Sequence, residues 1–170
     1  MARYVIVPDR STVWIDAKSS LHPIHSEVRG LLGFVDVEVD GSGALDLSKT
    51  PSGHLELAVD QLSSGNPLYD REMKRRIESR RYPTIVGDLS EMSADGEAGS
   101  YVVRGDVTFK GVTQVCQDTM TIAAKEDLLV LEGAHTFDVR DFGMEPPRIM
   151  MLKVHPEVDV RVEITARREG

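Results

Sequence analysis

The sequence predicts an all-β protein built from short antiparallel strands with one short α-helix. Three stretches, at residues 35–39, 55–59 and 158–164, alternate an apolar residue with a polar or small one almost strictly. This is the pattern of a strand with one buried face. The same period, less regularly, extends over residues 3–7, 11–17, 84–92, 101–109, 113–123 and 127–138. Turn signals separate these segments, so roughly eight to ten strands are expected, with neighbours paired antiparallel.

One segment breaks this period of two. Asn66 is a helix-capping residue, and the proline after it suits the first helical turn. Tyr69, Met73 and Ile77 then recur every four residues, which places them on one face of a helix. Acidic residues come early and basic residues late, as the helix dipole favours. We therefore expect a single helix at residues 67–79.

Many short antiparallel strands with a single helix fit two architectures, a sandwich or a closed barrel. The aromatic content of 5% is a hint toward the barrel, because a filled sandwich core usually carries more bulky rings. A barrel of about eight strands is wide enough to hold one small ligand. No repeat or linker divides the chain, so residues 1–170 are expected to form one domain.

Composition narrows the class of protein. The formal net charge of -8 argues against a nucleic-acid partner, which usually requires a basic face. The single cysteine, Cys116, forms no intrachain disulfide and fits a reducing compartment. The first residues lack the apolar run of a secretory signal, and no run of about 18 apolar residues follows. We therefore expect a cytoplasmic protein without a cofactor.

Four stretches, in order along nearly the whole chain, carry a resemblance to a known family. They are the stretch from residue 11 to Gly33 and Phe34, DREM at 70–73 with RYP at 81–83, VRGDVTFKGVT at 103–113, and RDFGM at 140–144. On these motifs the sequence resembles the YceI-like family of lipocalin-type barrels, which bind polyisoprenoid or related long-chain lipids. The resemblance implies a lipocalin-like barrel of about eight strands and a homodimer. The chain departs from the family in lacking a secretion signal and the histidine that often falls near Met73 or Lys74.

This reading predicts a carrier or storage protein, not an enzyme. Its barrel interior is expected to hold one elongated apolar ligand: a polyisoprenoid, an isoprenoid quinone or a fatty-acid-like lipid. Residues that face inward on the alternating strands, with one from the loop before the last strand, are expected to line the site. They are Val35, Val37, Leu57, Val59, Tyr101, Val103, Val107, Phe109, Met120, Ile122 and Phe142.

Basic residues are candidates for the polar end of a ligand. The segment from Arg71 to Arg81 contains six basic and two acidic residues, which suits an anionic head group or membrane surface. A solvated helix face is the alternative. Arg140 is a second head-group candidate, with internal ion pairing as its alternative. For the homodimer we expect the apolar side of the helix and the loop around Pro146 and Pro147, because acids on the exposed sheet edge would repel a symmetric copy.

The rival hypothesis is a small enzyme acting on a hydrophobic substrate inside the barrel. It requires two or more titratable groups that converge in the interior. The residues that would have to share a pocket are His135, Arg140 and Asp141. Nothing near Cys116 in the sequence would lower its pKa. A metal site is not expected, because Pro23 prevents a regular helix from presenting His22 and His25 together and zinc needs three or four ligands.

Overall fold

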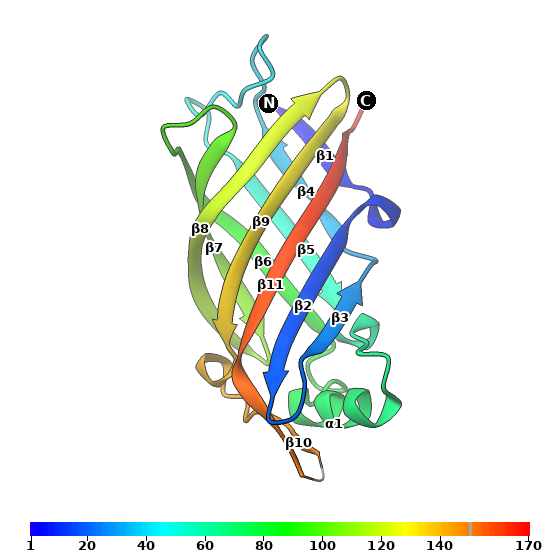
Figure 1. Ribbon diagram of the computed structural model, residues 1–170. Coiled ribbons are helices and arrows are strands. Elements are labelled where there is room, and N and C mark those ends of the chain that lie inside the picture. The colour runs from blue at the N-terminus through cyan, green and yellow to red at the C-terminus, as the bar shows by residue number, and fades with distance from the viewer. Residues whose placement is uncertain (150) are drawn as a thin grey trace.

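The structure is a computed structural model that describes residues 1–149 and 151–170. It contains one α-helix, α1 (Pro67–Ile77), and three short 3-10 turns at Pro8–Arg10, Val59–Gln61 and Val139–Phe142 (Figure 1). Its strands are β1 (Ala2–Ile6), β2 (Thr12–Ser19), β3 (Ile24–Val28), β4 (Leu32–Val37), β5 (Ser52–Ala58), β6 (Thr84–Ala94), β7 (Ser100–Phe109), β8 (Val112–Lys125), β9 (Leu128–Asp138), β10 (Arg148–Ile149) and β11 (Leu152–Arg168).

Eight of the strands close into an antiparallel barrel, which confirms the predicted fold class. Their order around the barrel is β1-β4-β5-β6-β7-β8-β9-β11, and β11 returns to pair with β1. The 17-residue β11 is long enough to pair with three neighbours. It pairs with β9 on one edge, and on the other edge with β2 and then with β1. β2 and β3 therefore continue the wall beyond the ends of β1 and β4 (Figure 1).

A buried serine joins β1 and β2 along the edge of β11. The 3-10 turn at Pro8–Arg10 interrupts the ladder, and Ser11 follows it, almost fully buried. The Ser11 hydroxyl donates to the Val7 carbonyl at 2.9 Å and accepts from the Thr165 amide at 3.1 Å. These bonds satisfy backbone groups that the interruption would otherwise leave without a partner.

Four elements differ from the sequence prediction. β3 and β10 were not expected, because five and two residues are too short to show a clear period. β11 extends well beyond residues 158–164, with a register irregularity between Val154 and Val158 around Pro156, which has no amide proton to donate. α1 ends at Ile77 and not at residue 79, because Glu78 adopts a left-handed conformation with φ of 59°.

Side chains fill the barrel at the end where the two chain termini lie, which we call the closed end (Figure 1). Tyr4, Val37 and Leu129 are buried in this region. The loop that carries Leu45 packs against it, and the Leu45 amide donates to the Tyr101 hydroxyl at 3.0 Å. This end of the barrel is therefore sealed by packed side chains. α1 lies at the other end, below β3 in Figure 1.

The outer faces of the strands carry paired charges, as the alternation predicts. The Arg3 side chain donates to Asp36 across β1 and β4 at 2.8 Å. On β5 and β6, the His54 ring is hydrogen-bonded to Asp88 at 2.6 Å and to Glu56 at 2.9 Å. The two carboxylates, Asp88 foremost, raise the pKa of His54. These ion pairs join neighbouring strands of the barrel wall, which gives them a structural explanation.

Gly33 on β4 lies very close to the backbone of β5. Its φ of +140° is rarely adopted by residues with a side chain. A Cβ atom built on Gly33 would lie 1.9 Å from the His54 carbonyl oxygen. The contact is with the backbone of β5, so no side-chain rotation relieves it.

We predict that Gly33→Ala lowers the free energy of unfolding by about 3 kcal/mol or more, through backbone strain and steric overlap. Gly41→Ala is the matched control, because nothing lies within 4 Å of a Cβ at that position. It should change stability by less than about 0.5 kcal/mol. Urea denaturation followed by circular dichroism measures both. Equal midpoints for the two variants would contradict the close approach of β4 and β5.

Candidate ligand-binding site

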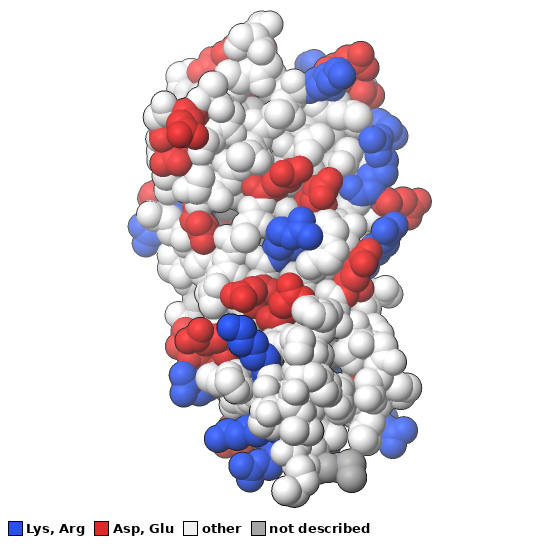
Figure 2. Space-filling view, in the orientation of Figure 1, with Lys and Arg blue, Asp and Glu red and all other residues white. Residues whose placement is uncertain are grey.

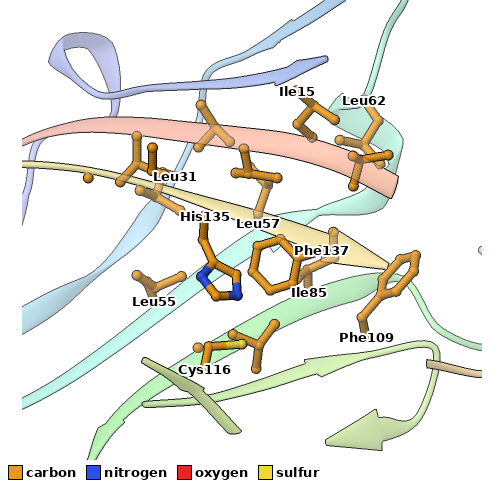
Figure 3. A pocket seen from close by; sticks show the side chains of 18 of the residues that line it. Ile15, Leu31, Leu55, Leu57, Leu62, Ile85, Phe109, Cys116, His135 and Phe137 are labelled. Carbon is orange, nitrogen blue, oxygen red and sulfur yellow. The ribbon is translucent and has the colours of Figure 1, made fainter. Parts of the chain in front are cut away.

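The barrel interior holds a cavity of about 470 Å³ (Figure 3). Its lining comes from strands all around the barrel and from α1, and it is almost entirely aliphatic and aromatic. The labelled side chains in Figure 3 include Ile15 on β2, Leu55 and Leu57 on β5, Ile85 on β6 and Phe109 on β7. The volume falls within the range of about 300–1,000 Å³ that is typical of small-molecule sites.

The structure places eight of the eleven predicted lining residues at the cavity. They are Val35, Leu57, Val103, Val107, Phe109, Met120, Ile122 and Phe142. The other three are buried elsewhere. Val37 and Tyr101 pack at the closed end, and Val59 packs in the 3-10 turn that follows β5. Alternation predicts which face of a strand a residue occupies, but not its height along the barrel, and height separates these three from the cavity.

The apolar side of α1 covers one end of the cavity. Asn66 caps the helix by accepting from the amides of Leu68 and Tyr69. Tyr69, Met73 and Ile77 all line the cavity, and Ile77 is almost fully buried. The four-residue spacing therefore predicted the apolar face of the helix correctly. The expectation that this face forms a dimer interface is wrong, because the face packs over the barrel of the same chain. The homodimer itself stays a prediction and needs another surface.

The RDFGM motif inserts an aromatic ring at the α1 end of the cavity. The Asp138 side chain accepts from the Arg140 amide at 2.9 Å and so begins the 3-10 turn. Gly143 ends the turn with a left-handed φ of 72°. Phe142 is thereby held in the interior, edge-on to Phe109 at 5.7 Å and 6.2 Å from Phe137 between ring centroids. The motif supports a wall of three phenylalanine rings.

The two predicted head-group residues lie outside the cavity lining. Arg140 forms an ion pair with Asp138 at 2.7 Å, which holds the pKa of that carboxyl below its usual value. Internal pairing, the alternative for Arg140, is thus the arrangement that the structure has. Arg71 is exposed on α1. No lysine or arginine is among the described residues that line the cavity.

Polar side chains do enter the lumen from β8 and β9. His135 Nδ1 is hydrogen-bonded to Asp118 Oδ2 at 3.0 Å, and both residues line the cavity together with Cys116. Arg140 and Asp141 are not among the described lining residues, so the three groups named for the enzyme hypothesis do not share this pocket. The sequence pattern did not single out Asp118, because an acidic residue in an amphipathic strand is expected on the outer face.

His135 and Asp118 are two titratable groups that converge in the lumen, as the enzyme hypothesis requires, whereas Cys116 is disfavoured as a nucleophile. Burial, with a further contribution from the Asp106 carboxylate, raises the pKa of the Cys116 thiol, so a reactive thiolate is disfavoured. Across residues 1–149 and 151–170, no group of three His, Cys, Asp or Glu side chains is arranged to hold a metal ion. His25 pairs instead with Asp16 on the outer face. In the same residues, no helix has the length and apolar character needed to cross a bilayer.

Comparison with known proteins identifies the family. The model of the YceI-like domain matches residues 4–166. This chain belongs to the YceI-like family. No curated protein matches the sequence of this YceI-like domain.

Solved structures share the fold at low sequence identity. BcnA from Burkholderia cenocepacia superposes with a TM-score of 0.77 at 17% identity, covering 95% of this chain and 99% of that chain. A polyisoprenoid binding domain from Saccharophagus degradans, described as implicated in plant cell wall breakdown, gives 0.76 at 12% identity, covering 99% and 100%. A YceI protein from Campylobacter jejuni gives 0.67 at 10% identity, covering 85% of each. At these identities the YceI-like domain shares their fold, and its site must be argued from its own residues.

We predict that Val107→Trp fills the cavity and lowers the affinity for the neutral apolar dye N-phenyl-1-naphthylamine by about tenfold or more, with little change in melting temperature. An open lumen accepts the added ring, whereas a filled core would lose about 1–3 kcal/mol of stability through overpacking. Val115→Trp is the matched control, because Val115 on β8 faces outward and is 56% exposed. Dye fluorescence and thermal unfolding measure the two effects. Two results together would contradict an open cavity: a lower melting temperature of the Val107→Trp variant, and no uptake of dye by the wild-type protein.

Proposed function

We propose that this YceI-like domain binds one elongated apolar molecule in the barrel lumen, as a carrier or storage protein. A single observation carries the proposal: an apolar cavity of about 470 Å³ that is packed shut at one end and covered by α1 at the other. Every 100 Å² of apolar ligand surface removed from water contributes about 2.5 kcal/mol. A chain burying roughly 400 Å² would thus gain about 10 kcal/mol before the costs of ordering, so tight binding needs no covalent bond.

The shape and chemistry of the lumen favour a narrow group of ligands. A polyisoprenoid, an isoprenoid quinone or a fatty-acid-like lipid is long and flexible enough to follow a lumen inside a barrel. The description of the Saccharophagus degradans domain as polyisoprenoid binding supports the first of these. We propose a cytoplasmic location. Cys116 is the single cysteine of the sequence and forms no intrachain disulfide, which fits a reducing compartment.

Organic extraction of purified protein tests this function. We expect mass spectrometry of the extract to reveal a long-chain apolar lipid in a near-equimolar amount. Delipidated protein should take up an isoprenoid alcohol, quinone or fatty acid, and the bound chain should slow alkylation of Cys116 by N-ethylmaleimide about tenfold or more, because this thiol lines the lumen.

The matched control for alkylation is Cys116→Ser combined with Val115→Cys, which moves the only thiol to the outer face of β8. Its alkylation rate should not respond to lipid. An extract without lipid, together with unchanged Cys116 alkylation in the presence of all three lipid classes, would disprove the proposal.

We also propose that the α1 end contacts anionic membranes when ligand is exchanged. The most exposed apolar side chains there are Leu21, in the β2–β3 turn, which is 73% exposed, and Met151, beside β10, which is 91% exposed. The two segments are adjacent, because the Ser20 amide donates to the Lys153 carbonyl at 2.9 Å. His22, next to Leu21, is hydrogen-bonded to the Tyr69 hydroxyl on α1.

Basic residues surround these apolar side chains. Arg71 and Lys74 on α1, with Arg148 and Lys153 near β10, form no ion pair within the part of the chain that the structure describes. Figure 2 shows lysine and arginine side chains on both sides of the lower end of the molecule. Protruding apolar side chains within a basic surface are the combination that binds an anionic bilayer.

Vesicle flotation tests the membrane contact. We expect binding to phosphatidylcholine vesicles that contain phosphatidylserine, with a loss at high salt. Arg71→Glu should weaken binding about fivefold or more, since each basic residue near an anionic surface contributes about 1 kcal/mol. Lys125→Glu, in the last residue of β8 at the closed end, is the matched control and should bind normally. Equal binding to vesicles without phosphatidylserine would contradict an electrostatic contact.

A further inference from the structure

We propose that His135, held by Asp118, forms a hydrogen-bonding site in the lumen that selects long apolar chains bearing a hydroxyl group. The ligand class is an isoprenoid or aliphatic alcohol, or a chain carrying a phenol. This inference rests on the proposed function, because it specifies the polar group of the molecule that the lumen holds.

Strand register directs both side chains into the barrel. The backbone pairing of β8 with β9 ends at Met120 opposite Gly133, and both of these residues line the cavity. Asp118 and His135 lie two residues further along their strands, so they share that inward face. In Figure 3 the His135 ring projects into the cavity beside Phe137, and the two ring centroids are 4.6 Å apart.

The hydrogen bonds of Asp118 determine which nitrogen of His135 carries the proton. Asp118 Oδ2 accepts from His135 Nδ1 at 3.0 Å, and Asp118 Oδ1 accepts from the Thr119 amide at 2.8 Å. A carboxylate only accepts hydrogen bonds, so in the neutral imidazole the proton lies on Nδ1. His135 Nε2 then presents a lone pair as an acceptor.

That acceptor has no partner within the part of the chain that the structure describes. Among residues 1–149 and 151–170, the only hydrogen bond of the His135 ring is the one to Asp118. Every fully buried side-chain nitrogen and oxygen atom in this part of the chain does have a partner, so Nε2 faces open space. An apolar chain that fills the lumen excludes water from Nε2, and an unsatisfied buried acceptor is costly. A ligand with a hydroxyl donor removes that cost.

The charges of the lumen argue against an anionic head group at the same position. No lysine or arginine is among the described lining residues, while Asp118 places a carboxylate directly behind the imidazole. A carboxylate or phosphate would enter an apolar cavity without a fixed cation. A hydroxyl is neutral and supplies the donor that Nε2 needs. The packing of His135 against Phe137 holds the imidazole ring in one orientation, and a fixed ring is better suited to recognise a ligand hydroxyl group.

His135 and Asp118 also bridge β8 and β9 beyond their last backbone pairing. The test must therefore separate a role in ligand recognition from a role in supporting the barrel wall. Hexadecanol and its methyl ether are matched probes: both present an oxygen at the same chain position, but only the alcohol donates. Displacement of N-phenyl-1-naphthylamine gives a Kd for each. The informative quantity is the ratio of the ether Kd to the alcohol Kd, which a general loss of stability would not change.

We expect His135→Leu to lower this ratio about fivefold to tenfold relative to the wild-type protein, the range expected for one hydrogen bond. His25→Leu is the matched control, because His25 pairs with Asp16 in the same way on the outer face of β2 and β3. Its ratio should equal that of the wild type.

A second measurement needs no variant and so does not depend on how His135→Leu folds. In ¹⁵N NMR spectra of the wild-type protein, we expect the His135 Nε2 resonance to shift on addition of hexadecanol and to stay in place on addition of the ether. A ratio unchanged within about twofold in His135→Leu, with both probes still bound, would overturn this inference and leave the proposed function standing. An Nε2 that is protonated in the free protein would also overturn it, and failure of both probes to bind would overturn the inference and the proposed function together.

Discussion

The fold depends on the pairing of β11 with three other strands. One edge of this strand follows β9 from Glu157 to Arg167, and the other joins β2 and then β1. A slip of one residue along either edge would turn Val158, Val160 and Val162 from the lumen to solvent, since the side-chain period of a strand is two. The register is therefore fixed by burial on the whole length of the strand. Closure of the barrel, the height of the cavity and the position of His135 all follow from it.

The cavity stays open because inward positions at mid-barrel are occupied by small residues. Gly87, Gly105 and Gly133 all line it. The side chains of Leu55 and Met120 lie over two of these glycines, where a Cβ atom would come within 3.0 Å and 2.8 Å of them. The three phenylalanine rings that could fill the centre are gathered at the α1 end instead. An interior of this composition has too little side-chain volume to pack at the density of a protein core.

The sequence allowed the fold class, the helix and most of the lining to be predicted, because each depends on a local period. What it could not provide is any relation between strands. Val37 and Tyr101 face inward as predicted, but only the pairing of strands shows that they lie at the closed end. β8 also reverses the usual pattern, with Val115 outward and Asp118 inward, so a rule that sends acids to the surface hides the partner of His135. The apolar face of α1 was likewise recognised from its spacing, while the surface it covers depends on tertiary structure.

The attachment of α1 has a kinetic consequence. The helix shares no backbone ladder with the barrel and is held by side-chain contacts, among them His22 with Tyr69 and Arg76 with Glu145. Displacing it exposes Met73 and Ile77 but breaks none of the strand pairs that define the barrel. For the proposed function, exchange of a ligand requires only a local opening at α1, whose free energy is smaller than that of global unfolding. The strand pairs of the barrel stay intact when α1 moves. The residence time of a ligand and the thermal stability of the barrel can therefore vary independently in evolution.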